Sequence, residues 1–555
     1  MEQSRLLIAI VLSLVIFLAW QFIFGPDETQ RRQEKKVEAP AVEEKQKPED
    51  IAKPYKEAIE KPVPAEESAV EKLTPQIAAT ITVDTPLYQA KISENGAVFY
   101  SFLLKNYREK VQKGAPLKQI LTGDETFGVG RLGFAGQSIV GLDKAVFSVD
   151  LPSRQLEVKD SPRDLTFSWR SQDGIVIEKT YKFAPDTYAI GMEVVIKNGS
   201  GRGIQDKLFV ALYSKAPGDK RMYAFEGPSA MINDKLQEIK TKKLKDQNTF
   251  DGQIKWVALQ SRYFMSGLVP DQIEEASLHL ALQSDKFVAA RYRQPEKAIQ
   301  PGTQYIYKYK LFMGPKRIEE LKNVGNDLHK VVDFGWFDIL AKPCLWLMNL
   351  FYSVIPNYGV AIIILTVLVK ILLWPLGQKS YKSMSEMKKI QPLMKEIREK
   401  YKNDKQRMNQ EVMGLYRTYK INPLGGCLPM VVQLPVFFAL YRMLYEAIEL
   451  RHAPFFLWID DLAAPDRLFR FDFSIPFMEP PYGIPVLTIV MGASMLLQQK
   501  MSPPMGDATQ AKMMMFMPII FTVIFINFSS GLVLYWLVNN ILSIAQQYYT
   551  QKKYT

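Results

Sequence analysis

The sequence is poor in the residues that most often carry chemistry. Among its 555 residues are only two cysteines, Cys344 and Cys427, and three histidines, His279, His329 and His452. Two cysteines in apolar surroundings do not make a disulfide framework, and no HExxH or CxxC pattern of a metal site is present in the sequence. The GxxxxGK[ST] loop that holds ATP phosphates is also absent from the sequence. We therefore expect neither a metal nor a nucleotide cofactor.

Long apolar runs are missing from residues 27–330 and frequent after about residue 336. Several of the later runs have roughly 20 residues, which is the length that crosses a bilayer. The net charge is +12, but acids are mixed among the basic residues, and no basic face carries aromatics for base stacking. The sequence predicts a multi-domain integral membrane protein with a large soluble part and no direct, specific nucleic-acid binding.

The first 75 residues predict an anchor followed by a tether. Residues 6–24 are apolar, follow Arg5 and lack the small-residue cleavage site of a secretory signal. We expect an uncleaved transmembrane anchor over 1–26, with its N-terminus inside the cell. Residues 27–75 are rich in Glu, Lys, Pro and Ala, a composition typical of a flexible linker.

Residues 76–325 predict a large antiparallel β-sandwich. Apolar and polar residues alternate in segments such as TYKFAPDTYAIGMEVVIKN, and turn residues separate these segments. The GSGRG cluster at 199–203 looks like a phosphate loop, but no helical pattern and no Lys-Ser/Thr follows it. That context favours a loop between two strands. Residues 326–351 are amphipathic and aromatic in their second half, which predicts a helix on the membrane surface.

Five apolar segments follow, and with the anchor they predict a six-span helical membrane part. The five segments are 352–376, 423–447, 483–499, 512–528 and 531–548. The loop 377–422 holds twelve lysines and arginines but five acids, so the positive-inside rule places it in the cytoplasm. The loop 448–482 holds six acids and three arginines, which places it outside with the sandwich. The loop 500–511 and the short basic tail 549–555 are then cytoplasmic.

One charge lies within the second span, at Lys370 in AIIILTVLVKILLWPL (361–376). A lysine at this depth costs about 2.5–3.5 kcal/mol on insertion scales. Snorkelling is one explanation, although the interface near Lys379 is roughly 13 Å of helix away. The alternative is a wet cavity between helices, in which the ammonium group attracts anionic guests. Thr366 lies one turn away on the same helix face, and further polar residues lie within other spans: Gln433, Gln498, Gln499, Asn539 and Asn540.

The cytoplasmic loop 377–422 predicts a helical hairpin. Apolar residues recur every three or four positions on both sides of a turn at Asn403-Asp404, which gives the hairpin one apolar seam. The methionines of interest in this seam are Met384, Met387, Met394 and Met408. Two interpretations stay open: the seam packs only on itself, or the flexible methionine side chains capture varied apolar clients.

Five segments of the membrane part resemble the YidC family of bacterial membrane protein insertases, within the Oxa-type superfamily, in its Gram-negative form. They are NPLGGCLPMVVQLPVFFALY (422–441), ELRHAPFFLWIDDL (449–462), QKMSPP (499–504), FMPIIFTVIF (516–525) and SSGLVLYWLVNN (529–540). The resemblance extends over nearly the whole chain. It implies a periplasmic β-sandwich and five core helices around a hydrophilic groove, which is open to cytoplasm and lipid and closed toward the periplasm.

The resemblance also implies roles for single residues. Lys370 stands where the family usually has an arginine in the groove, so the charge is kept but the bidentate fork is lost. Leu434 and Ile524 correspond to a hydrophobic slide on spans three and five, with Trp536 beside it. The hairpin corresponds to the family's client-capturing region. The groove residues expected in this chain are Lys370, Thr366, Gln433, Gln499, Asn539 and Trp536.

The function that the resemblance implies is insertion and chaperoning of nascent proteins in the bacterial inner membrane, without ATP hydrolysis and without enzymatic chemistry. The implied partners are nascent membrane proteins, the Sec translocon, the ribosome, the signal-recognition-particle pathway and the phospholipid bilayer. A secondary transporter or channel with a ligand-binding outer domain is the alternative, although the sequence shows neither repeated halves nor a deep carboxylate for proton coupling. An enzymatic sandwich is disfavoured because no histidine or paired-carboxylate constellation is apparent.

Overall fold

The computed structural model describes residues 78–112, 114–218, 224–283, 286–419, 428–502 and 508–554. All of these belong to the second of two compact units, Thr74–Thr555. The anchor predicted over 1–26 and the linker predicted over 27–75 lie outside the described residues.

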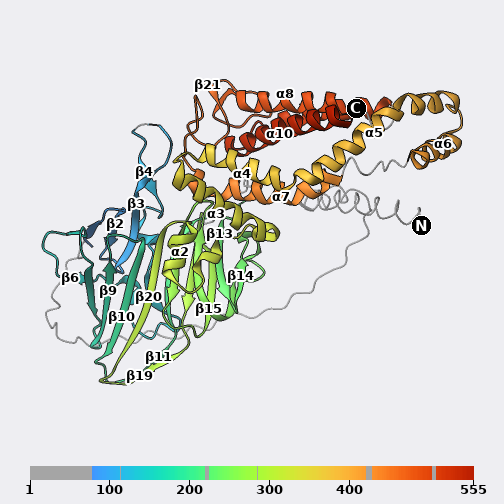
Figure 1. Ribbon diagram of the computed structural model, residues 1–555. Helices are drawn as coiled ribbons and strands as arrows, with labels where there is room; N and C mark the ends of the chain where they lie inside the picture. Colours follow the sequence, from blue (N-terminus) through green and yellow to red (C-terminus); the bar gives the residue numbers. More distant parts are fainter. Residues whose placement is uncertain are drawn as a thin grey trace, which may run out of the picture. The chain divides into compact units, whose positions relative to one another are not determined.

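The N-terminal half of the described chain is a β-sandwich (Figure 1). One sheet has the order β4 (Leu117–Gln119), β3 (Val98–Arg108), β2 (Tyr88–Ser93), β1 (Thr80–Asp84) and β7 (Gln155–Glu157). The larger sheet has the order β5 (Arg131–Phe134), β12 (Leu208–Lys215), β18 (Phe287–Arg293), β17 (Glu275–Gln283), β15 (Thr249–Gln260), β16 (Phe264–Pro270), β20 (Gln304–Pro315), β10 (Ala189–Asn198), β9 (Ile175–Phe183), β8 (Arg163–Arg170) and β6 (Ser148–Val149). Strands β13 (Gly227–Ile232) and β14 (Lys235–Glu238) pair beside β15.

The strand pattern confirms the predicted large, mainly antiparallel sandwich. Side chains of β10 alternate strictly between buried and partly exposed positions, which is expected for a strand with one face packed on the core and the other facing outward. β10 pairs with β9 and β20 over nearly its whole length. The pairing of β1 with β7 is parallel, a detail that the alternating pattern could not predict.

A buried lysine joins the two sheets. Lys179 on β9 is fully buried, and its Nζ donates to the carbonyl oxygens of Gly96 (3.2 Å), Ala97 (2.7 Å) and Gly130 (2.5 Å). The Tyr181 hydroxyl donates to the Ala97 carbonyl over 2.7 Å. Three ammonium donors therefore meet three carbonyl acceptors, which offsets part of the cost of burying the charge. These bonds tie the β2–β3 turn of the smaller sheet to β9 of the larger sheet, together with Gly130, the residue before β5.

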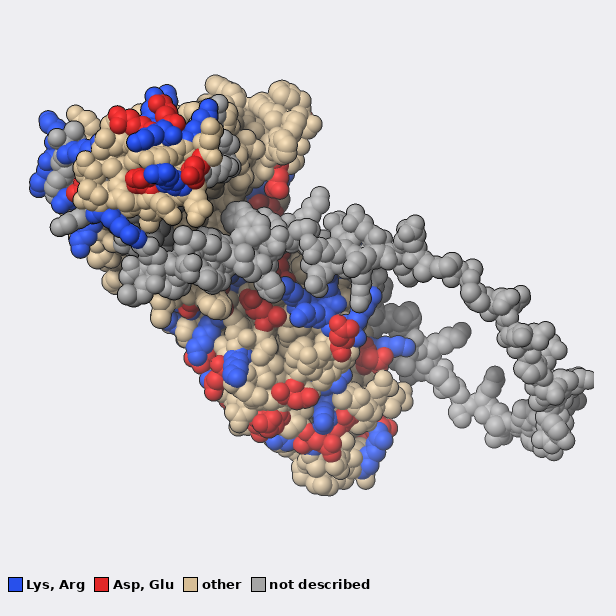
Figure 2. Space-filling view, turned by 90° about the vertical axis from the view of Figure 1, so that its right-hand side faces the viewer, with Lys and Arg blue, Asp and Glu red and all other residues tan. Residues whose placement is uncertain are grey.

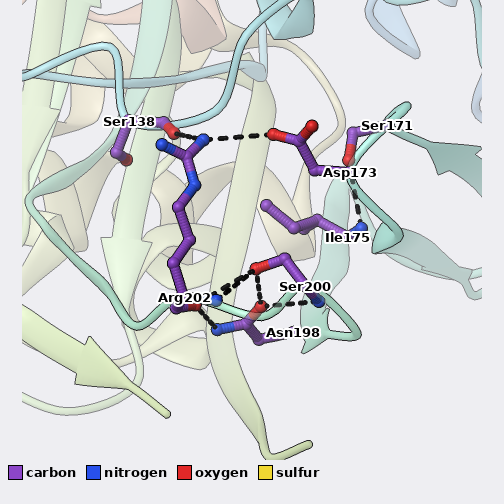
Figure 3. A network of polar contacts seen from close by, with 7 residues as sticks. All are labelled: Ser138, Ser171, Asp173, Ile175, Asn198, Ser200 and Arg202. Carbon is purple, nitrogen blue, oxygen red and sulfur yellow. Dashed lines mark hydrogen bonds and ion pairs between the residues drawn. The ribbon is translucent and has the colours of Figure 1, made fainter. Parts of the chain in front are cut away.

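The GSGRG cluster is a loop between β10 and β11 (Ile204–Asp206), as the sequence predicts. The Asn198 amide donates to the Arg202 carbonyl (2.8 Å), and its oxygen accepts from the Ser200 amide (3.1 Å) and hydroxyl (2.6 Å). The Arg202 guanidinium crosses to the Ser138 carbonyl (3.2 Å) and to Asp173 (3.1 Å), as Figure 3 shows. The polar groups of the loop thus tie neighbouring turns of the sandwich together. β11 pairs with the short strand β19 (Lys297–Ile299).

The C-terminal half is helical, and a small pair of strands, β21 (Leu468–Phe471) and β22 (Tyr482–Ile484), interrupts it (Figure 1). Its helices are α2 (Ile318–Val324), α3 (Asp338–Val354), α4 (Tyr358–Leu372), α5 (Trp374–Lys400), α6 (Lys405–Thr418), α7 (Leu428–Glu446), α8 (Val486–Met501), α9 (Ala508–Phe525) and α10 (Ser530–Tyr554). Among the described residues, no single helix has both the length and the apolar character of a complete membrane span, while α4 and α5 have them when taken together across a bend of 65°. The number of spans stays a prediction.

The bend separates two helices within the predicted span 352–376. α4 ends at Leu372 and α5 begins at Trp374, with Pro375 in its first turn. Proline disfavours a helical conformation of the preceding residue, and its ring clashes with the carbonyl four residues earlier. The sequence predicted one continuous span over 352–376 because residues 361–376 are almost entirely apolar, and hydropathy alone does not reveal this local break.

Candidate functional site

Lys370 lies in the last turn of α4 and contacts α10. Its Nζ donates a hydrogen bond to Ser543 Oγ over 2.7 Å. Ser543 in turn donates to the backbone carbonyl of Asn539, one turn earlier on α10, over 2.7 Å. The hydroxyl can accept from the ammonium group because its own proton is directed to the carbonyl. This geometry fixes the position of Lys370 without neutralising its charge.

The polar contacts continue from α10 to two further helices. The Gln433 amide on α7 donates to the side-chain oxygen of Asn539 over 3.0 Å. On the α8 side, the Asn540 amide donates to the Ser494 hydroxyl over 3.0 Å. The centre of the helical part is therefore a chain of polar contacts from α4 through α10 to α7 and α8, which we call the α10 polar network.

The network continues toward the end of α10. Gln546 is fully buried, and its amide donates to the Trp374 carbonyl at the bend between α4 and α5 over 2.9 Å. A Cβ added at Gly377 would lie 2.8 Å from the Gln546 side chain, so a glycine is needed for this approach. The buried polar residues of α10 recur at spacings of three and four and are Asn540, Ser543, Gln546, Gln547 and Thr550. They form one polar seam along a helix that is otherwise largely apolar.

The charge at Lys370 has neutral surroundings. Within the described ranges, no carboxylate lies at ion-pairing distance from Lys370, and no group of three or more His, Cys, Asp or Glu side chains could hold a metal ion. The site therefore combines one cation with hydroxyl and amide groups. Such a set can bind polar or acidic peptide groups.

The structure brings some of the expected groove residues together and leaves others apart. Lys370, Gln433 and Asn539 share the α10 polar network. Thr366 is buried and donates to the Ile362 carbonyl of its own helix over 2.6 Å. Gln499 is half-buried in the last turn of α8, where its backbone carbonyl accepts from Ser502.

Three members of the site were not expected from the sequence: Ser543, Ser494 and Tyr381. The Tyr381 hydroxyl lies within hydrogen-bonding reach of Ser543. The helical spacing of the polar residues after Asn540 is the signal that could have identified Ser543. Serine is common in helices of every kind, so the spacing alone does not show which residue of another helix it contacts.

Aromatic side chains border the network on the side of α7 and α9. The Trp536 ring lies edge-on to Phe437, with centroids 4.6 Å apart, and edge-on to Phe525 at 4.8 Å. Leu434 is half-buried, while Ile524 is 44% exposed. The exposed apolar residues of α9 are Met515, Phe516, Met517, Ile519, Ile520, Val523 and Ile524. An apolar surface on α9, exposed among the described residues, therefore lies beside the polar network.

The hairpin of α5 and α6 uses part of its methionine seam for its own packing. Met387, Ile390 and Met394 are buried and pack against Leu415 and Tyr416. The Tyr416 hydroxyl lies 3.4 Å from the Met394 sulfur atom. The self-packing interpretation therefore holds for the centre of the seam.

The rest of the seam is more open to solvent. Met384 and Met408 are half-buried, and Met413 is 44% exposed. In Figure 2, the end of the helical part that faces the viewer carries lysines and arginines with acids between them. The exposed basic residues of the hairpin include Lys388, Lys395, Lys402 and Arg407.

Comparison with known proteins gives the chain relatives over nearly its whole length. The family model "60Kd inner membrane protein" matches residues 350–555, and the model "YidC periplasmic domain" matches residues 80–347. The chain is 44% identical to the membrane protein insertase YidC of Syntrophus aciditrophicus over 85% of each chain. It is 40% identical to that of Syntrophobacter fumaroxidans, with 99% of this chain and 100% of the relative covered. A solved active YidC insertase with its first transmembrane domain resolved is 18% identical, covers 85% of this chain and 92% of its own, and has a TM-score of 0.38.

Proposed function

The chain belongs to the YidC family of membrane protein insertases, and we propose that it inserts nascent inner-membrane proteins by way of the α10 polar network and the apolar surfaces of α7 and α9. The observation that supports this proposal most directly is the bond between Lys370 and Ser543. A neutral hydroxyl fixes the cation but leaves its charge available to a passing client. Acidic and polar segments of a client then replace the hydroxyl as the partner of Lys370.

The apolar surfaces supply the driving force of the proposed reaction. The hydrophilic outer segment of the client passes Lys370, while its apolar helix moves along Leu434, Ile524 and Trp536 into lipid. Transfer of apolar surface out of water releases about 25 cal/mol per Å². The membrane potential adds to this for acidic segments. The mechanism therefore requires no nucleotide hydrolysis.

The topology and the partners form a second part of the proposal. Six spans with both termini in the cytoplasm place the β-sandwich in the periplasm, in agreement with the positive charge of the hairpin. The half-buried Met384 and Met408 capture apolar client segments before insertion. The chain acts alone or with the Sec translocon, and it receives clients from the ribosome through the signal-recognition-particle pathway. The basic surface of the hairpin supports docking of an anionic ribosome.

Reconstitution tests the proposal. The purified full chain is placed in vesicles of phosphatidylethanolamine and phosphatidylglycerol without nucleotide or translocon, and a single-span client with an acidic outer segment is added. We expect a protease-protected client fragment with the natural chain and less of it with Lys370→Ala. Equal protection in vesicles without the protein would contradict the proposal.

Deletion of residues 80–310 separates insertion from ligand transport. An insertase whose activity lies in the helical part keeps much of its insertion after the deletion. A transporter that depends on ligand capture by the outer domain loses solute flux in the same vesicles. Complete loss of insertion, with the helical part still folded, would show that the helical part does not suffice.

A further inference from the structure

One short segment between α7 and α8 binds the ends of three helices. These ends are the start of α8, the end of α9 and the start of α10, and together they form what we call the outer end of the helical part. The amide and hydroxyl of Ser530, the first residue of α10, donate to the Ala464 carbonyl over 2.8 and 2.6 Å. The next amide, of Gly531, donates to the Leu462 carbonyl over 2.9 Å. Asp466 and Arg467, two and three residues after Ala464, contact α8 and α9.

Asp466 caps the start of α8. It is 3% exposed, and its carboxylate accepts hydrogen bonds from the backbone amide of Leu487 and from the Trp458 ring nitrogen. The amide of Thr488 is a further donor to it. The first amides of a helix have no partner within the helix and carry the positive end of its dipole. A buried carboxylate at this position satisfies both requirements.

Arg467 caps the end of α9. It is 5% exposed, and its guanidinium donates to the carbonyl of Ile526, directly after α9, over 2.8 Å. It also donates to the Asn527 side chain (3.2 Å) and to the Pro481 carbonyl (2.9 Å). The last carbonyls of a helix carry the negative end of its dipole, so a cation is favourable there.

The order of the two charges matches the direction of the two helices. α8 begins at the outer end and α9 ends there, so they present opposite dipole ends to adjacent residues of opposite charge. The helices also touch farther along, where a Cβ added at Gly492 would lie 2.1 Å from the Thr522 hydroxyl. The outer caps therefore act on two helices that already pack closely.

We propose that Asp466 and Arg467 are a positioning pair that holds the outer ends of α8 and α9 together. The purpose of this positioning rests on the proposed insertase function, because α9 contributes the apolar surface along which a client moves. The positioning itself rests on the contacts at the helix ends. Loss of either cap frees the outer turn of one helix, which holds Ile489 on α8 or Val523 on α9, so the distance between these positions is no longer fixed even where the packing at Gly492 remains.

A distance measurement on the full chain in phosphatidylethanolamine and phosphatidylglycerol vesicles tests the pair. Spin labels are placed at Ile489 on α8 and Val523 on α9, whose side chains are 51% and 40% exposed. We expect one narrow distance distribution in the otherwise natural chain and loss of the narrow peak with Arg467→Gln. The matched control is Arg470→Gln, which removes an exposed arginine that pairs with Asp460 at 3.3 Å. An unchanged narrow peak with Arg467→Gln would overturn the proposal.

A charge exchange tests the role of the helix dipoles. The double variant Asp466→Arg with Arg467→Asp keeps both charges and their adjacency but directs each to the wrong helix end. We expect it to lose the narrow peak as completely as Arg467→Gln, whereas retention of the peak would contradict the dipole assignment. Arg467→Lys keeps the charge but lacks the planar guanidinium whose separate nitrogens contact Pro481, Ile526 and Asn527. We therefore expect a partial loss of the narrow peak, and this variant replaces Arg467→Gln if that variant fails to accumulate.

Client insertion is measured in the same vesicles. Failure of the natural chain to insert a client, with its narrow peak intact, would refute the proposed function and leave the positioning pair standing. Insertion by the natural chain together with an unchanged peak in Arg467→Gln would refute the pair alone.

Discussion

The ammonium group of Lys370 and the hydroxyl of Ser543, 173 residues apart in the chain, lie 2.7 Å from each other and join α4 to α10. The bond holds a cation in a largely apolar helix against a neutral partner. A carboxylate partner would stabilise the charge more strongly but would also compete with the acidic groups of a client. Under the proposed function, the neutral partner holds Lys370 in place and keeps its charge available to a client.

Substitution of Lys370 tests whether positive charge is what the site requires. In cells depleted of the natural protein, we expect Lys370→Arg to support growth, Lys370→Ala to support it weakly and Lys370→Glu to fail, because the last variant repels acidic client segments. The control is Lys379→Glu, which makes the same charge change at an exposed position of α5. Growth with Lys370→Glu equal to that with Lys370→Arg would make the charge irrelevant.

Removal of the hydroxyl partner has a smaller expected effect. Ser543→Ala leaves the charge in place but no longer fixes it, so we expect reduced insertion in reconstituted vesicles that stays above the level of Lys370→Ala. A typical hydrogen bond to a charged group contributes about 1.5–3 kcal/mol. Ser353→Ala, which removes an exposed hydroxyl that donates to the Leu350 carbonyl of its own helix α3, is the matched control and should insert clients as the natural chain does. Insertion by Ser543→Ala below that of Lys370→Ala would show that the hydroxyl has a separate role.

Photocrosslinking separates the two interpretations of the hairpin seam. A crosslinker at Met384 or Met408, both half-buried, is expected to form adducts with ribosome-bound clients. The same crosslinker at Met387 or Met394 lies in the buried contact between α5 and α6 and should form few adducts. Equal amounts of adduct at all four positions would mean that the hairpin opens during capture. Absence of adducts at both Met384 and Met408 would contradict the proposed capture of clients by the hairpin.

Substitution of Lys179 tests whether its buried hydrogen bonds stabilise the β-sandwich. Lys179→Met removes the donor to three carbonyl groups, and each acceptor left without a partner in a core costs about 1–3 kcal/mol. The Ala97 carbonyl keeps its bond from Tyr181, so two carbonyl groups lose their donor and we expect a total loss of roughly 2–6 kcal/mol. Hydrogen exchange of the β9 amides in the full chain measures this loss as a lower free energy of opening.

Lys182→Met is the control for this substitution on the same strand. The Lys182 side chain is 51% exposed and pairs with Glu193 at 3.2 Å. An exposed ion pair contributes about 0–1 kcal/mol, so the control should exchange nearly as the natural chain does. Equal exchange in the two variants would mean that the buried contacts of Lys179 do not stabilise the domain.

The sequence predicted the elements whose pattern is local. Alternation along 189–198 predicted a strand that the structure confirms as β10, and the spacing of Met387 and Met394 predicted the buried seam of the hairpin. The context of the GSGRG cluster likewise predicted a strand-to-strand loop. In each case the pattern of residues within a short segment of the sequence carries the information.

Features that depend on distant residues were harder to predict. The partner of Lys370 lies far along the chain, and a serine in an apolar helix gives no sign of the neighbour that it serves. The order of strands in the larger sheet and the parallel pairing of β1 with β7 are likewise set by long-range packing. Asp466 and Arg467 appear in the sequence as ordinary loop charges, because their burial depends on helix ends that are formed elsewhere.

The path of the client helix is the central claim, and site-specific crosslinking from Ile524 tests it most directly. Ile524 is 44% exposed on α9, while its neighbour Phe525 is 4% exposed and packs against Trp536. With crosslinkers at each position in turn and with ribosome-bound nascent membrane proteins, the account predicts strong client adducts from Ile524 and few from Phe525. Absence of adducts from Ile524, together with absence from Leu434 and Trp536, would contradict it.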